Sequence, residues 1–522
     1  MPWSKERLEE VSRTCLGGAK LIVVANREPY IHVYDGEGIH WMKPASGLTT
    51  ALDPVMQVCN GTWVAHGSGE ADREASDEKG RARVPPPNPT YTLRRVWLSK
   101  QEQQGYYYGF ANEGLWPLCH IAYTRPRFDD RDWDQYRTVN RKFADAVLDE
   151  VDDEPAVVFV QDYHFALLPR MLRNARPNLV ILHFWHIPWP NREVFRVCPY
   201  QEEILDGLLG NDLLSFHIQN HCNNFLETVD RALESKVDME AFSVTRAGKT
   251  TLVQPQPISI ACELGEVITE QELRQQEAGL RKRLHLRDQQ LLLGVDRVDY
   301  TKGIPERFRA AERLLELHPN LKGKFSFLQV GAPSRVDIPA YRRLSEELHA
   351  LVEEINCRHG DDSWRPLIFL NEHHEADQVY SLYRAATACV VSSLHDGMNL
   401  VAKEFVAARA DLRGVLVLSR FTGAAQDLPD ALLVNPFAVD DFAEALHQAL
   451  QMPEAQQEWR MRRMRQQVAD NNIYRWAGML LSEASKLLAS RPGAGNGELP
   501  FATPFTNHYS PLTLMEAHHE GA

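Results

Sequence analysis

Short, continuous runs of apolar residues recur along the chain, and each run is followed by a turn and a stretch with helical periodicity. In the first half the runs occupy residues 21–27, 156–161, 179–185 and 212–218, and in the second half residues 290–298, 325–331, 367–371, 388–394 and 414–421. Continuous apolar runs are typical of strands buried on both faces of a parallel sheet, and their alternation with helices indicates βαβ units. The pattern predicts an α/β protein with two doubly wound domains.

The junction between the two sets of strands lies in an extended segment, residues 251–261, which two prolines interrupt. We therefore expect an N-terminal domain over residues 1–256 and a C-terminal domain over residues 257–475, with a further helix at 476–490. Residues 491–522 are rich in proline, glycine and polar side chains, and this composition predicts a mobile tail.

The composition narrows the class of protein. A chain of 522 residues favours two or three domains, and 44% hydrophobic with 25% charged residues predicts packed cores. No apolar run approaches the roughly 18–20 residues of a membrane span, and the charged N-terminus has no signal-peptide core, so a cytoplasmic location is expected. A net charge of −14 argues against nucleic acid as a partner. The eight cysteines are scattered, which predicts free thiols rather than disulfides.

In the second half, charged residues stand where strands are predicted to end. In GVDRVDYTKGIPERF, Arg297 ends a strand and Lys302 precedes a helix that begins with proline. A diphosphate would meet both cations and free backbone N–H groups there, although two surface cations solvating a loop explain the same pattern. In SSLHDGMNLVAKEF, Asp396 opens a turn, the backbone of residues 398–401 starts a helix, and Glu404 lies one turn on. The free backbone N–H groups at the helix start suit an anion, and Glu404 suits a ribose diol. Alternatively, Asn399 serves only as the N-cap of the helix.

The first half supplies complementary residues. Arg27 and Asp162 each follow a predicted strand, and His186 precedes two prolines. The turn at Ser46–Gly47 opens a helix and suits close approach of a phosphate. The aromatic run at residues 105–120 is either core or a surface that stacks against a sugar.

Two histidine patterns suggest a metal but lack the context of a metal site. His217 and His221 are four residues apart, and His373, His374 and Glu375 are adjacent, yet neither set has a third ligand at a suitable spacing. The sequence therefore predicts no metal site. It also contains no G-x-G-x-x-G, G-x-S-x-G or Walker motif.

Eight sequence blocks follow one another along the chain: NREPY, WVAHGSG, YYYGFANEGLWP, QDYH, HIPWP, GVDRVDYTKGIPERF, PSRVD and HDGMNLVAKEFVAA. In content, order and spacing they resemble glycosyltransferase family 20, from about Leu21 to about Ala489. The resemblance implies a GT-B arrangement, in which two Rossmann-like domains face a central cleft, with the helix at 476–490 crossing back to the first domain. It also implies a metal-independent enzyme without a cofactor, whose partners are a nucleotide sugar and a sugar phosphate. The family's type activity transfers glucose from a nucleoside diphosphate glucose, here expected to be UDP-glucose, to glucose 6-phosphate with retention, and so makes trehalose 6-phosphate.

The resemblance assigns a role to each candidate residue. The donor site would be formed by Ser46, Gly47, Met398, Asn399, Leu400, Val401 and Glu404, and the catalytic group by His186, Arg297, Lys302 and Asp396. The acceptor site would be formed by Arg27, Tyr107, Trp116, Asp162 and Arg335. Arg297 and Lys302 would stabilise the charge on the leaving diphosphate, whose oxygen takes the proton of the incoming hydroxyl on the front face of the sugar.

The sequence departs from the family pattern at Ser46, where the type member has the first glycine of a pair. The REPY sequence after Asn26 also resembles glucosylglycerol-phosphate synthases of the family, and another member couples cyclitols. Three functions therefore stay open: a trehalose 6-phosphate synthase, a relative with another acceptor, and a catalytically silent sugar-phosphate sensor. The intact Arg297, Lys302, Asp396 and Glu404 argue against the sensor. The sequence leaves a homo-oligomer open.

Overall fold

The computed structural model describes residues 3–36, 38–44, 47–151, 155–262 and 288–491, and the single positions 279, 282 and 286. Ser46 and the tail 492–522 lie outside these residues, so the predictions for them stay untested. Within the described residues, no helix has both the length and the apolarity that a membrane crossing needs.

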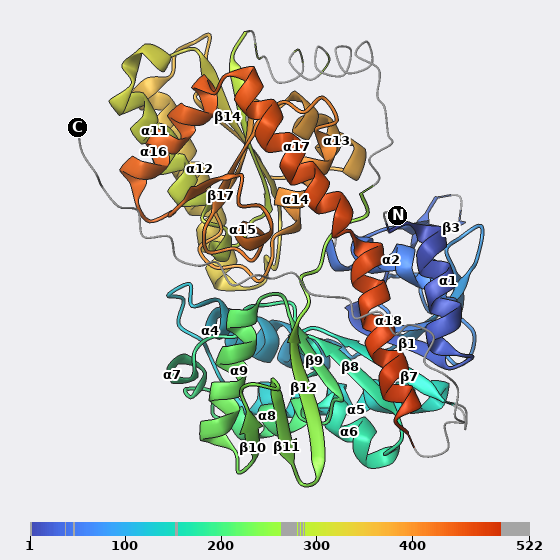
Figure 1. Cartoon of the computed structure of the whole chain (residues 1–522). Coiled ribbons are helices and arrows are strands. Elements are labelled where there is room, and N and C mark those ends of the chain that lie inside the picture. The colour runs from blue at the N-terminus through green and yellow to red at the C-terminus, as the bar shows by residue number, and fades with distance from the viewer. Residues whose placement is uncertain are drawn as a thin grey trace.

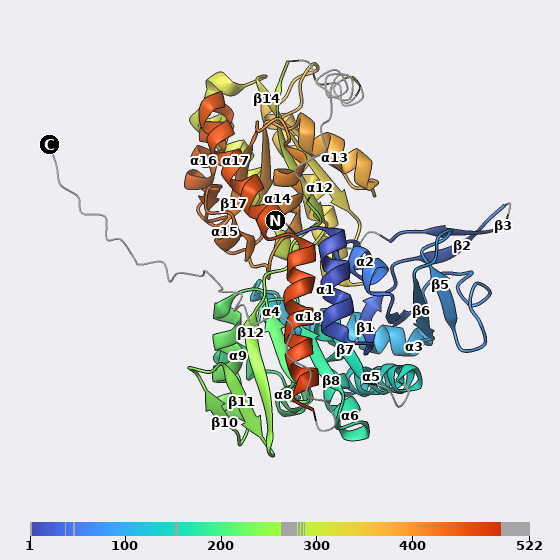
Figure 2. The same ribbon diagram turned by 45° about the vertical axis from the view of Figure 1, so that its right-hand side comes forward.

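The first half of the chain builds a ten-stranded sheet in the order β10-β11-β12-β9-β8-β7-β1-β4-β6-β5. The strands from β12 to β6 run parallel, and antiparallel strands flank them at both edges. The bounds are β1 Lys20–Arg27, β4 Thr62–His66, β5 Arg81–Val84, β6 Tyr91–Val96, β7 Ala156–Gln161, β8 Val180–Phe184, β9 Leu213–Phe216, β10 Lys236–Asp238, β11 Ser243–Arg246 and β12 Lys249–Pro255. We call the part of the chain built on this sheet the N-terminal domain. A separate hairpin, β2 Ile31–Asp35 with β3 Gly38–Met42, projects from it (Figure 2).

The second half builds a six-stranded parallel sheet in the order β15-β14-β13-β16-β17-β18, and we call this part the C-terminal domain. The bounds are β13 Gln290–Arg297, β14 Phe325–Ala332, β15 Leu367–Leu370, β16 Ala388–Val391, β17 Val415–Ser419 and β18 Leu432–Val434. This order is that of a doubly wound fold, with the reversal between β13 and β16. The strands predicted from the nine apolar runs are confirmed as β1, β7, β8, β9, β13, β14, β15, β16 and β17.

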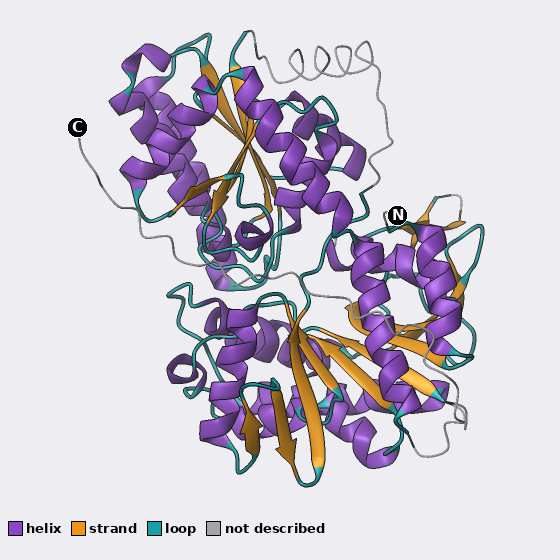
Figure 3. Ribbon diagram, in the orientation of Figure 1, coloured by secondary structure: helices purple, strands orange, loops and turns teal. Residues whose placement is uncertain are grey.

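Helices cover both faces of each sheet (Figure 3). In the N-terminal domain they are α1 Lys5–Leu16, α2 Gly47–Cys59, α3 Lys100–Gln103, the π-helix η1 Gln104–Leu115, α4 Trp116–His120, α5 Asp130–Glu150, η2 Tyr163–Phe165, α6 Leu168–Ala175, α7 Arg192–Phe195, α8 Gln201–Leu208 and α9 Gln219–Ala232. In the remainder they are η3 Tyr300–Lys302, α11 Ile304–Leu317, η4 Pro319–Leu321, α12 Pro339–His359, α13 Ala376–Ala385, α14 Leu400–Ala408, α15 Ala424–Asp427, α16 Val439–Gln451, α17 Glu454–Asp470 and α18 Ile473–Ala489. In Figure 1, α11, α12 and α16 lie on one side of the six-stranded sheet and α13, α14 and α17 on the other.

The last described helix, α18, packs on the N-terminal domain beside α1 and α2 (Figure 1). The Asn472 side chain donates to the carbonyl of Trp3 at 2.8 Å, and the Trp476 indole donates to the carbonyl of Gln256 at 3.2 Å. The chain therefore returns to its first domain after completing the second. The domain bounds at residues 256 and 475 stay predictions.

Candidate active site

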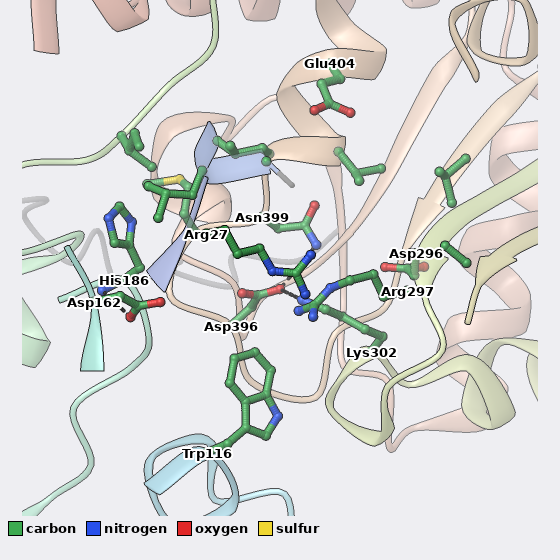
Figure 4. A pocket seen from close by; sticks show the side chains of 18 of the residues that line it. Arg27, Trp116, Asp162, His186, Asp296, Arg297, Lys302, Asp396, Asn399 and Glu404 are labelled. Carbon is green, nitrogen blue, oxygen red and sulfur yellow. Dashed lines mark hydrogen bonds and ion pairs between the residues drawn. The ribbon is translucent and has the colours of Figure 1, made fainter. Parts of the chain in front are cut away.

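A cavity of about 430 Å³ lies between the two domains and takes its walls from both. In each domain the site residues follow strands next to the point where the strand order reverses: β1 and β7 in the N-terminal domain, and β13 and β16 in the C-terminal domain. Every candidate residue in the described part of the chain lines this cavity: Arg27, Gly47, Tyr107, Trp116, Asp162, His186, Arg297, Lys302, Arg335, Asp396, Met398, Asn399, Leu400, Val401 and Glu404. Figure 4 shows Arg27, Arg297 and Lys302 pointing into one region next to Asp396.

Lys302 and Asp396 form an ion pair on the C-terminal wall. Lys302 Nζ lies 2.5 Å from Asp396 Oδ2, which also accepts hydrogen bonds from Ser393 Oγ at 3.1 Å and Asn399 Nδ2 at 3.3 Å. Burial opposes ionisation of Asp396, but the charge of Lys302 and these bonds hold its pKa well below the usual range. Asp396 is therefore an ionised group that fixes the position of the lysine ammonium.

Asn399 caps the N-terminus of α14. Its backbone has φ 89°, and its side-chain oxygen accepts a hydrogen bond from the N–H of Ala402 at 3.2 Å. The N-cap interpretation of the sequence is thus confirmed, and the helix start also forms part of the cavity wall. Gly47 faces this helix start from the N-terminal domain, since a Cβ atom at Gly47 would lie 3.5 Å from Leu400 Cδ1.

Glu404 marks a second, more apolar end of the cavity. Its carboxylate accepts a hydrogen bond from the Tyr383 hydroxyl at 3.0 Å, and burial raises its pKa above the usual value. Figure 4 shows Glu404 well apart from Arg27 and Asp396. Apolar side chains share this wall of the C-terminal domain: Val295, Val330, Val379, Leu400 and Val401. A flat aromatic group with an attached diol matches a wall of this kind.

Two arginines and two aromatic rings form the opposite end of the cavity. The Arg335 guanidinium carbon lies 4.2 Å from the centre of the Trp116 ring, and Arg335 Nη2 donates to the Tyr163 hydroxyl at 3.3 Å, across the two domains. Arg27 Nη2 donates to the Tyr107 hydroxyl at 3.4 Å. Burial opposes ionisation of Tyr107, but the charges of Arg335 and Arg27 lower its pKa to about 7. Two guanidinium groups beside these aromatic rings make this end of the cavity attractive to anions.

Asp162 and His186 form the floor of the cavity on the N-terminal side. Asp162 has a left-handed backbone with φ 71°, and its Oδ1 accepts from the N–H groups of Tyr163 at 2.9 Å and His186 at 3.3 Å. Burial raises the pKa of Asp162 to about 7. Burial and the neighbouring His183 lower the pKa of His186 to about 3, so its imidazole is neutral. Its Nε2 lies 2.9 Å from Gln161 Oε1, which orients the ring.

Three buried polar atoms of the lining have no hydrogen-bond partner within the described part of the chain: His164 Nε2, Trp116 Nε1 and Arg335 Nε. Leaving such groups unpaired costs roughly 1–3 kcal/mol each. All three belong to residues at the anion-attracting end of the cavity.

The sequence model of glycosyltransferase family 20 matches residues 19–486 of the chain. The chain belongs to this family. Its two Rossmann-like domains therefore form the GT-B arrangement that the sequence predicted, and the protein is a glycosyltransferase.

The family relatives match over nearly their whole length. The trehalose-6-phosphate synthase of Mycolicibacterium vanbaalenii is 37% identical over 474 residues, covering 89% of this chain and 96% of the relative. Among solved structures, a protein from E. coli described as bound with UDP-2-fluoro glucose is 32% identical with a TM-score of 0.78, covering 90% of this chain and 99% of that one. An alpha,alpha-trehalose-phosphate synthase (UDP-forming) from Burkholderia xenovorans, in complex with glucose-6-phosphate, is also 32% identical with a TM-score of 0.78, covering 89% of this chain and 100% of that one.

Several lining residues of this glycosyltransferase were not predicted from the sequence. Tyr163 and His164 directly follow Asp162, and that adjacency to a strand end is the signal that could have found them. His373 and His374, considered above only as metal ligands, line the cavity beside Val379. The remaining unpredicted residues are Asn26, Leu48, His217, Ile258, Val295, Asp296, Val330 and Ala332.

Proposed function

We propose that this glycosyltransferase transfers glucose from UDP-glucose to glucose 6-phosphate with retention of configuration, and so makes trehalose 6-phosphate. The observation that carries the proposal is the presence of four neighbouring cations in one cavity. Arg297 and Lys302 stand on the C-terminal wall, Arg27 and Arg335 lie beside Tyr107, and the guanidinium carbons of Arg297 and Arg335 lie 5.6 Å and 4.2 Å from the centre of the Trp116 ring. Four adjoining cations in one cavity fit two phosphate-bearing substrates that react with each other.

The donor occupies the C-terminal wall in this proposal. The diphosphate lies against Arg297, Lys302 and the start of α14, where the helix dipole favours negative charge. Glu404 accepts hydrogen bonds from the ribose diol, and the valines beside it hold the base. The E. coli relative with its UDP-2-fluoro glucose supports a uridine nucleotide.

The acceptor phosphate binds between Arg27 and Arg335, which present guanidinium groups suited to a phosphate. Trp116 packs beneath Arg335, and the carboxyl of Asp162 orients the sugar hydroxyls. The Burkholderia xenovorans complex with glucose-6-phosphate supports this acceptor.

The chemistry follows from the charges in the cavity. Among the described lining carboxylates, Asp396 is paired with Lys302, and Asp296 is paired with Arg307 at 2.6 Å. Asp162 accepts two backbone N–H bonds, and its pKa is raised to about 7. Glu404, the fourth of these carboxylates, accepts a hydrogen bond from the Tyr383 hydroxyl at 3.0 Å. Each of the four thus has a partner within the protein, which supports reaction on the front face without a carboxylate nucleophile. A leaving diphosphate oxygen accepts the proton of the incoming hydroxyl while Arg297 and Lys302 stabilise the developing charge. A solved relative is described in terms of glycosyltransfer with retention.

A matrix of activity assays tests the proposal. UDP-, GDP- and ADP-glucose are each combined with glucose 6-phosphate, glycerol 3-phosphate and a cyclitol phosphate, and the products are identified by mass and anomeric configuration. The largest kcat/KM is expected for UDP-glucose with glucose 6-phosphate, giving an α,α-linked product. A large preference for glycerol 3-phosphate or a cyclitol phosphate would overturn the acceptor assignment and leave the donor site standing.

A further inference from the structure

Arg307, on helix α11, is a fully buried arginine in the interior of the C-terminal domain. Its side chain has no surface exposed to solvent, and the residue does not line the cavity. The proposed transfer reaction gives it no role. Removing a guanidinium group from water is unfavourable unless partners in the protein replace the lost hydrogen bonds, so the identity of those partners is informative.

The guanidinium group donates hydrogen bonds to four residues. Nη1 donates to Asp296 Oδ2 at 2.6 Å and to Gln329 Oε1 at 2.9 Å. Nε donates to Ser392 Oγ at 2.8 Å, and Nη2 donates to the backbone carbonyl of Lys302 at 3.0 Å. All three nitrogens of Arg307 are therefore bonded within the protein.

Three of these partners stand beside the residues that act in the proposed reaction. Asp296 directly precedes Arg297 at the end of β13. The carbonyl that Arg307 holds belongs to Lys302 itself. Ser392 directly follows β16 and leads into the turn of Asp396. One buried side chain thus joins the three segments that carry the catalytic candidates of the C-terminal wall.

The surroundings of the guanidinium group are closely packed. A Cβ atom at Gly294 would lie 2.4 Å from Arg307 Nη1 and 2.2 Å from Gln329 Oε1. The hydroxyl of Ser392, which accepts from Arg307, donates in turn to the carbonyl of Gly303 at 2.7 Å. A lysine has a single terminal nitrogen and cannot reproduce bonds that three nitrogens make in a planar fork. The arrangement therefore depends on the shape of arginine and not only on its charge.

We propose that Arg307 is a positioning residue for glucosyl transfer, which fixes the loop of Lys302 and the strand end of Arg297 in the arrangement that stabilises the leaving diphosphate. The inference rests on the proposed function, which assigns these two cations to the diphosphate. Arg307 touches no substrate and acts only through its neighbours. Misplacing a group by about 1 Å can lower a rate about 10²-fold, so a loosened loop lowers kcat even in a folded protein.

A double-mutant cycle of Arg307→Lys and Lys302→Ala tests the proposal, with the best donor and acceptor of the assay matrix. Arg307→Lys alone is expected to lower the single-turnover rate about tenfold or more. Because part of this effect passes through Lys302, the same change should cost at least about threefold less in the Lys302→Ala background than in the wild type. The KM for the acceptor should stay within about threefold, because Arg27 and Asp162 lie in the other domain.

Arg173→Lys is the matched control for the loss of a buried arginine. Arg173 is also buried and also donates to four residues, one of them a carboxylate: Gly210, Pro177, Leu179 and Asp212. None of these partners lines the cavity. Arg173→Lys is therefore expected to lower the Tm while kcat stays within about twofold.

Ser392→Ala covers the case that Arg307→Lys folds poorly. It removes the hydroxyl between Arg307 and the carbonyl of Gly303, and it is expected to lower kcat about threefold or more with the same dependence on Lys302. Equal losses in both backgrounds, or a loss no larger than that of Arg173→Lys, would overturn the inference and leave the proposed function standing. A Lys302→Ala variant with the wild-type rate would instead contradict the proposed function, and the inference with it.

Discussion

The carboxyl of Asp162 is buried, and its environment favours the protonated form. Burial raises its pKa to about 7, well above the value of about 4 in an unfolded chain. Between these values the folded protein binds more protons than the unfolded chain, so this residue makes the protein less stable as the pH rises from about 4 to about 7. The amide of Asp162→Asn keeps an oxygen for the N–H groups of Tyr163 and His186 and carries no charge.

Asp162→Asn is therefore expected to raise the Tm at pH 8 and to raise it less at pH 5, where the wild-type carboxyl is largely protonated. The same change removes an acceptor for sugar hydroxyls, so kcat/KM should fall more for glucose 6-phosphate than for glycerol 3-phosphate, which has no ring. Thermal unfolding at both pH values checks the expected change in Tm, and steady-state kinetics with both acceptors check the expected change in kcat/KM. A Tm that falls equally at both pH values would contradict the role given to burial.

In the proposed function, Arg297 and Lys302 stabilise the charge that develops on the leaving diphosphate. Loss of one preorganised electrostatic contact lowers turnover by about 10²-fold or more, and this is expected for Arg297→Ala and for Lys302→Ala. The Lys302 variant also leaves Asp396 without its partner at 2.5 Å. Single-turnover rates measure the effect, with circular dichroism to verify folding. Near wild-type rates in a folded variant would show that the assigned role is wrong.

At Arg27, the positive charge of the side chain can be separated from the shape of its guanidinium group. A lysine keeps the positive charge but loses the planar fork that binds two phosphate oxygens. Arg27→Lys is expected to raise the KM for glucose 6-phosphate about tenfold or more, while the KM for UDP-glucose stays nearly constant. Initial-rate kinetics with each substrate varied in turn separate the two constants. Equal changes in both would indicate that Arg27 does not belong to the acceptor side.

At the scale of elements, Gly303 connects η3 to α11 and fixes the loop that carries Lys302. It has φ +61°, and a Cβ atom there would lie 2.2 Å from the carbonyl oxygen of Ser392. Gly323 has a similar φ of +74° with open space around it, so it is the matched control. Gly323→Ala should cost about 1–2 kcal/mol of left-handed strain. Gly303→Ala should cost that amount plus about 1–3 kcal/mol for the clash, and should lower kcat by displacing Lys302. Urea unfolding and kinetics of both variants measure the difference, and equal losses would contradict it.

The elements that the sequence predicted are those whose apolar pattern is uninterrupted. The strand β6 was missed because it carries two arginines, and Arg95 is fully buried in ion pairs with Glu28 at 2.8 Å and Asp72 at 2.9 Å. A buried charge of this kind depends on partners distant in the sequence, which a local pattern does not reveal. The hairpin of β2 and β3 was missed because its residues are largely exposed and lack a buried face.

The π-helix η1 and the residues that follow it show the same limit of a local sequence pattern, here within the candidate active site. The sequence left residues 105–120 open between core and a sugar-binding surface. In the structure Tyr106 and Phe110 are buried in the core, while Tyr107 and Trp116 line the cavity. Glycines allow the wide helix to approach α5, since a Cβ at Gly109 would lie 2.4 Å from the carboxylate of Asp132. The strand-end residues could be predicted because parallel strands bring their ends to one edge. Their hydrogen-bond partners required the packed structure.

At the scale of the whole molecule, an acidic protein encloses a cavity rich in cations. The chain carries a net charge of −14, yet Arg27, Arg297, Lys302 and Arg335 line one cavity between its domains. In the proposed function, therefore, substrate phosphates are recognised by a few cations placed in the cavity rather than by the net charge of the protein. Both domains contribute residues to this group of cations and their partners, since Arg335 of the C-terminal domain donates a hydrogen bond to Tyr163 of the N-terminal domain. Bringing the domains together therefore completes the anion site.

The same arrangement predicts that glucosyl transfer needs no metal ion. Arg297 and Lys302 can neutralise the leaving diphosphate, a task that Mg²⁺ or Mn²⁺ performs in many other transferases. Full activity is therefore expected after exhaustive treatment with EDTA, measured by release of UDP. A transfer rate abolished by EDTA and restored by Mg²⁺ or Mn²⁺ would show that the two cations do not suffice.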